Sequence, residues 1–132
     1  MSNIVVYDIS GKFRNVSAPP DMLVMQCQDG EAFLIGSGNP ELEYVHQGEI
    51  TPRPTQSTAI DKTTIQANGV DLVQITGIPT DATLTAKNKT TGDTVSGPVS
   101  GSDSFYSSIA GIIELTITKW PYLDWSATIE AV

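Results

Sequence analysis

The residue types that carry out catalysis or bind metals are few and scattered in this sequence. His46 is the single histidine and Cys27 the single cysteine, so any Ser-His-Asp or Cys-His site would have to use them. A zinc site with one residue of each type would need unusual help from carboxylates. We expect His46 to be an ordinary surface or strand-flanking residue, and we predict no metal site and no cofactor.

Glu41 and Glu43 are the carboxylate pair whose spacing suits catalysis. Two residues apart on a strand, their side chains would share a face, and paired carboxylates can hydrolyse glycosides. The pair lies in a short predicted hairpin without an obvious cleft, so glycoside hydrolysis is a minor alternative. Acidic turns such as Thr91-Gly92-Asp93 lack the dense oxygen ligands of a calcium-binding loop. We predict no catalytic residues, and we expect that the chain is not an enzyme.

Large apolar residues are better candidates for binding a partner. Trp120, Tyr122 and Trp125 lie close together in the sequence. If exposed, they would stack on sugar rings or anchor a protein. If buried, they would fill a corner of the fold, which is the favoured interpretation, although one indole could still face outward. In the first half of the chain, we expect contacts with a protein partner from Met22, Leu23 and Met25.

Composition and charge argue against several classes of partner. The net charge is −8, from 7 basic and 15 acidic residues, and no basic cluster interrupts it, so we expect no nucleic acid or anionic membrane as partner. The hydrophobic content of 39% is typical of a folded chain. We recognise no signal peptide and no run of about 20 apolar residues that would span a membrane. We therefore expect synthesis in the cytoplasm and, with Cys27 alone, no disulfide.

Residues 1–51 have the pattern of a small module of short strands and turns. The predicted strands are 4–7, 12–16, 31–35, 43–46 and 49–51, which can pair as hairpins. After Pro19-Pro20, Asp21 could cap a two-turn helix over 22–26, and a strand there is nearly as well supported. The prolines at 52 and 54 predict a stiff, extended linker over 52–55.

Residues 56–132 show the alternation and turn spacing of a β-sandwich. Ile113, Leu115 and Ile117 alternate with polar residues, which indicates a strand with one buried face. The predicted strands are 63–67, 72–76, 82–88, 94–99, 104–107, 112–119 and 126–132. The predicted fold class is therefore mainly β: a small N-terminal β-hairpin module followed by a compact immunoglobulin-like β-sandwich without a disulfide.

Short turn-and-strand patterns occur along most of the chain. In the first half they are Tyr7-Asp8 with Gly11, Pro20-Asp21-Met22, Gln26, Gly30-Glu31, Gly36, Tyr44-Val45, Gly48 and Pro52-Arg53-Pro54. In the C-terminal half they are the stretches 61–65 and 67–71, Ile78-Pro79, Gly111, Pro121-Tyr122-Leu123 and Ile129-Glu130-Ala131. The N-terminal set resembles small proteins encoded among bacteriophage tail genes, and the C-terminal set is similar to the immunoglobulin-like modules of phage particles. Relatives tend to place phenylalanine where this chain has Trp120.

This resemblance implies a structural protein of a tailed bacteriophage particle, associated with the tail or a tail fibre. It would be made in the host cytoplasm and located in the virion, with other phage structural proteins of the tail, fibre or capsid as partners. We expect residues 1–51 to dock on the particle, residues 56–132 to project from it, and several symmetric copies to form a ring. The alternatives are a capsid decoration protein and a carbohydrate-binding module for a host-surface glycan. The resemblance implies no catalytic residues.

Overall fold

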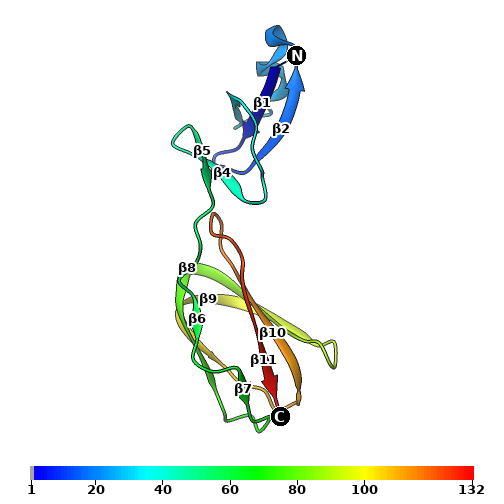
Figure 1. The fold of residues 1–132 in the computed structure, drawn as a ribbon, viewed down its shortest axis with the longest axis vertical. Helices are drawn as coiled ribbons and strands as arrows, with labels where there is room; N and C mark the ends of the chain where they lie inside the picture. The colour runs from blue at the N-terminus through cyan, green and yellow to red at the C-terminus, as the bar shows by residue number, and fades with distance from the viewer. Residues whose placement is uncertain (1) are drawn as a thin grey trace. The chain divides into compact units, whose positions relative to one another are not determined.

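A computed structural model describes residues 2–132 and divides the chain into two compact units (Figure 1), the first ending at Pro54 and the second spanning Thr55–Val132. Strands make up 54% of the described residues and helices 5%, and Cys27 is a free thiol. The predicted fold class, mainly β with a sandwich and no disulfide, is confirmed. The division of the chain falls inside the predicted linker, residues 52–55.

The first unit contains one small sheet, two helical turns and a separate hairpin. In chain order its elements are β1 (Ser2–Tyr7), β2 (Phe13–Ala18), η1 (Pro20–Met22), η2 (Val24–Gln26), β3 (Ala32–Ile35), β4 (Glu43–His46) and β5 (Glu49–Pro52). The sheet has the antiparallel order β2-β1-β3, and β4 pairs with β5. The sequence left a two-turn helix and a strand open for residues 22–26. The segment forms neither, because it lies in two short 3-10 turns.

The core of the first unit joins the sheet to the hairpin. Val5, Phe13 and Val45 are buried there, and Tyr7, Leu34 and Ile50 pack against them. Gly11 makes this contact close: its carbonyl accepts a 2.9 Å hydrogen bond from the Val45 N–H. Its φ of 88° suits glycine, and a Cβ at this position would lie 2.4 Å from the Val45 carbonyl oxygen.

The second unit is the β-sandwich. Its elements are β6 (Ala59–Ile60), β7 (Thr64–Ile65), β8 (Val73–Asn88), β9 (Thr94–Phe105), β10 (Gly111–Thr118) and β11 (Trp125–Ala131). The strands β6, β8, β10, β11 and β7 are hydrogen-bonded in that order, and β9 pairs with β8. The strand β7 is shorter than the predicted strand 63–67, and β6 is a strand that the sequence pattern did not indicate.

Two long, bent strands, β8 and β9, take part in both layers of the sandwich. The first part of β8 pairs with β6, its second part pairs with β10, and β9 follows it along both parts. The predicted strands 72–76 and 82–88 are therefore one strand, β8, and the predicted strand 94–99 continues into the first half of 104–107 as β9. The bend lies at Gly77, Asp81 and Gly101, which have positive φ, and the β8–β9 register shifts there. Such bulges let one strand pass between layers without ending it.

The buried face of β10 lies where the sequence alternation predicted it. Ile113, Leu115 and Ile117 are at most 2% exposed, and they belong to the main core of the second unit. The rest of this buried core comes from the other strands: Ile65, Val73, Ile75, Ile78, Ala82, Ala86, Val99, Ile129 and Ala131.

Candidate docking surface

The residues considered for catalysis have ordinary surroundings in the structure. His46 is exposed on β4, and its ring centroid lies 5.5 Å from that of Tyr44. The Glu43 carboxylate accepts a 2.8 Å hydrogen bond from the Asn39 N–H, so it holds the loop before β4. Across residues 2–132, no group of three or more His, Cys, Asp or Glu side chains is arranged to hold a metal ion.

The segment 20–26, which we call the apolar turn, presents apolar side chains to solvent. Its backbone is set by prolines at 19 and 20 and by two short hydrogen-bonded turns. The Met22 N–H donates to the Pro19 carbonyl at 2.9 Å, and the Gln26 N–H donates to the Leu23 carbonyl at 3.1 Å. With only three residues in each helical turn, there is no continuous apolar face to pack on the sheet, and neither turn contains a buried residue.

Three large side chains provide the exposed apolar surface of the apolar turn. Val24 and Met25 are 70% and 69% exposed, and Met22 is 41% exposed. Leu23 is half-buried. Of the predicted partner-binding residues, Met22 and Met25 are therefore available to a partner. Val24, which was not among the predicted residues, is exposed beside them. An exposed apolar cluster of this kind marks an interaction surface more often than an isolated apolar residue does.

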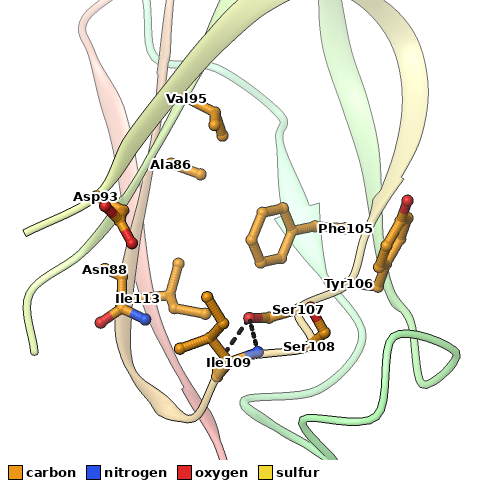
Figure 2. A pocket seen from close by; sticks show the side chains of 10 residues that line it. All are labelled: Ala86, Asn88, Asp93, Val95, Phe105, Tyr106, Ser107, Ser108, Ile109 and Ile113. Atoms are coloured by element: carbon orange, nitrogen blue, oxygen red, sulfur yellow. Dashed lines mark hydrogen bonds between the residues drawn. The ribbon is translucent and has the colours of Figure 1, made fainter. Parts of the chain in front are cut away.

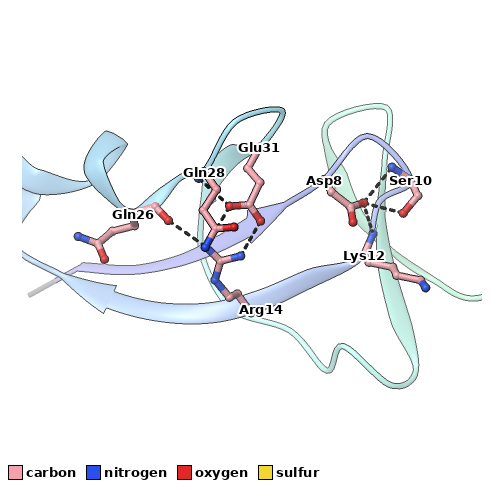
Figure 3. Close-up of polar contacts among 7 residues, drawn as sticks. All are labelled: Asp8, Ser10, Lys12, Arg14, Gln26, Gln28 and Glu31. Carbon is pink, nitrogen blue, oxygen red and sulfur yellow. Dashed lines mark hydrogen bonds and ion pairs between the residues drawn. The ribbon is translucent and has the colours of Figure 1, made fainter.

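An ion pair anchors the apolar turn to the sheet (Figure 3). Arg14 on β2 makes a two-pronged contact with the Glu31 carboxylate, with its second nitrogen 3.0 Å from Oε1. The same guanidinium nitrogen donates to the Gln26 carbonyl at 2.9 Å, and Glu31 also accepts from the Gln28 N–H at 2.7 Å. The turn is thus fixed by polar contacts at its end, which leaves its apolar side chains uncovered.

We expect acid to weaken this anchor. Hydrogen bonds from the Arg14 side chain and the Gln28 N–H hold the pKa of Glu31 below its ordinary value of 4.5. Because the pKa is lower in the folded chain than in the unfolded one, the contribution of Glu31 to stability is complete above the ordinary value. That contribution is lost as the pH falls through the lowered pKa.

Amide NMR can follow this titration, because the Gln28 N–H binds the Glu31 carboxylate. In the Arg14→Ala variant, the Gln28 amide should report a higher apparent pKa than in the wild type. The Ser10 amide provides an internal control, since it donates to the Asp8 carboxylate at 2.9 Å (Figure 3) and should titrate alike in both proteins. An unchanged Gln28 titration in Arg14→Ala would contradict this assignment.

The three aromatic residues predicted as an alternative binding group lie at the end of the sandwich. Trp120 and Tyr122 are in the connection between β10 and β11, and Trp125 is the first residue of β11. Each is half-buried, and Trp125 packs against the core of the second unit. The structure therefore places them partly within the fold, between the two interpretations that the sequence left open.

Comparison of the chain with protein-family models, with curated proteins and with solved structures finds no match. Among the described residues, no helix has the length and apolar character needed to cross a membrane.

Proposed function

We propose that this chain is a non-catalytic structural protein of a tailed bacteriophage particle, associated with the tail or a tail fibre. It would attach by protein–protein docking through its first unit. The observation that carries the docking proposal is the apolar turn, in which Val24 and Met25 are about two-thirds exposed although polar contacts hold the segment in place. The phage context comes from the resemblance of the sequence patterns.

The chemistry of the apolar turn suits a protein partner. Burying a Val or Met side chain contributes about 1.5–3 kcal/mol, so covering Met22, Val24 and Met25 offers several kcal/mol before the costs of association. Methionine adapts its shape to irregular surfaces. Since the turn is already anchored by Arg14, little conformational freedom is lost when a partner binds it.

The second unit supports the same proposal. Its strands pair in the orders β6-β8-β9 and β8-β10-β11, which are the A-B-E and C-F-G orders of immunoglobulin-like sandwiches. Modules of that kind commonly serve attachment at surfaces. In a symmetric particle, we expect several copies of the chain to occupy equivalent positions.

Incorporation into particles tests the proposal. We expect the double variant Val24→Lys/Met25→Lys to lower the amount of chain in purified tailed particles by at least about tenfold, because two charges would be buried in the interface. The matched control is Ile9→Lys, a change at a fully exposed apolar residue of the same unit. Quantitative mass spectrometry of the particles and circular dichroism of the variants provide the measurements.

The number of copies per particle, measured in the same experiment, distinguishes between two locations of the chain. About a dozen copies per particle would place the chain at the tail, whereas hundreds would identify capsid decoration. Absence of the wild-type chain from particles would overturn the proposal. Equal incorporation of the double variant would overturn the role of the apolar turn alone.

A further inference from the structure

The sandwich has an apolar groove along β9, at the side where the two layers are open. Two adjoining hollows of about 220 and 180 Å³ share Ala86, Val95 and Phe105 as lining residues. Figure 2 shows the Phe105 ring pointing into the space between the layers, with Ala86 of β8 and Val95 from the first part of β9 across from it and Ile109 below. We call the space lined by these four residues, with Asp93 and Asp103, the β9 groove.

The backbone beside the β9 groove is a free strand edge. Within residues 2–132, β8 is the one strand that pairs with β9. Gln74 of β8 directs both its N–H and its carbonyl to Asp61, on the β6 side. Its partner in the ladder, Ser104, therefore directs its own N–H and carbonyl away from β8. At Pro98 the edge has no backbone N–H to donate. A further strand would therefore pair more readily with the part of β9 near Ser104.

Two carboxylates face the groove without a cation. Asp93 and Asp103 are the charged residues among those lining the two hollows, and neither occurs in the ion pairs of the described residues. Asp103 instead accepts a 2.8 Å hydrogen bond from the Ser104 N–H. Its carboxylate thus occupies the position that the carbonyl of an added strand would take, and a charged residue at an edge hinders unspecific pairing.

We propose that the β9 groove binds an extended segment of a partner protein that is apolar at alternate positions and carries a lysine or arginine. The segment would add to the edge of β9 near Ser104, with its apolar side chains between Val95 and Phe105. Its carbonyl would replace Asp103 as acceptor of the Ser104 N–H, and Asp103 would then pair with the cation. This surface lies in the second unit and is independent of the apolar turn.

Synthetic peptides test this binding on the full chain by NMR titration. The probe is a short blocked peptide that alternates valine and threonine and contains one lysine. Matched peptides carry glutamate in place of lysine, or a central proline that removes a backbone donor. We expect saturable shifts along β9 with the lysine peptide, affinity at least about tenfold weaker for the glutamate peptide, and loss of binding with proline.

Substitutions in the β9 groove test the same peptide binding from the side of the chain. Val95→Arg should weaken the lysine peptide at least about tenfold, because Val95 lines the groove and is 65% exposed. Val70→Arg, at a similarly exposed valine outside the groove, should bind like the wild type. Asp103→Asn should remove the preference for lysine over glutamate. Absence of saturable binding, equal binding of the proline peptide, unchanged binding by Val95→Arg, or occupation of the groove by a second copy of this chain would each overturn the proposal.

Discussion

Replacing Leu115 with alanine is expected to lower the free energy of unfolding of the second unit by about 3 kcal/mol. Leu115 is fully buried on β10, which lies between β8 and β11 in the sheet. Its partners across the ladder are Ala86 and Ala127. Residues directly opposite each other share a face, so truncation would leave three alanines side by side, and neither neighbour is large enough to fill the cavity.

Urea unfolding followed by tryptophan fluorescence measures this loss. Both tryptophans of the chain, Trp120 and Trp125, belong to the second unit, so their emission reports on that unit alone. Ile112→Ala is the matched control, because this side chain is on the same strand but 39% exposed, and it should cost less than about 1 kcal/mol. Equal losses for the two variants would show that Leu115 does not hold the core.

Gly77→Ala is expected to destabilise the sandwich by about 3 kcal/mol, through two separable causes. The first is the φ of 70° at Gly77, which disfavours any residue with a Cβ. The second is space, because a Cβ here would lie 2.3 Å from the Ser57 carbonyl oxygen. That oxygen belongs to backbone held beside the bend, where Thr58 donates to the Gly77 carbonyl at 3.3 Å.

Two glycines of β9 allow the effect of the positive φ and the effect of the close contact to be measured separately. Gly101 has a similar φ of 72° but nothing near its Cβ position, and Gly97 has open space without a positive φ. We expect a loss of about 1 kcal/mol for Gly101→Ala and almost none for Gly97→Ala. Thermal unfolding of the three variants gives the series, and a loss for Gly77→Ala no greater than that for Gly101→Ala would rule out the contact with Ser57.

Local alternation was sufficient to predict the buried face of β10, because that signal depends only on neighbouring residues. It was insufficient for β8 and β9. Gly77 and Gly101 have the composition of turns, yet each lies within a strand because the two strands remain paired through the bend. Pairing between distant segments decides where a strand ends, and no local pattern carries that information.

For the proposed docking surface, too, the sequence predicted one part of the result and the fold decided the other. The apolar run around Met22 and Met25 was evident in the sequence, but its exposure depends on how the turn is anchored. Arg14 and Glu31 are separated by 17 positions, a spacing that indicates nothing until β2 and the segment before β3 are brought together. The β9 groove likewise results from an unpaired edge, which only the strand order reveals.

The parallel pairing of β7 with β11 determines how the second unit responds to stretching. Three hydrogen bonds of 2.8–2.9 Å join these two strands and the residues next to them. The Glu130 N–H donates to the Thr63 carbonyl, the Val132 N–H donates to the Ile65 carbonyl, and the Ala67 N–H donates to the Val132 carbonyl. When tension is applied between Thr55 and Val132, parallel strands are drawn in opposite directions along their length. All three bonds then bear the force together in shear, so the sandwich resists stretching until they rupture as a group.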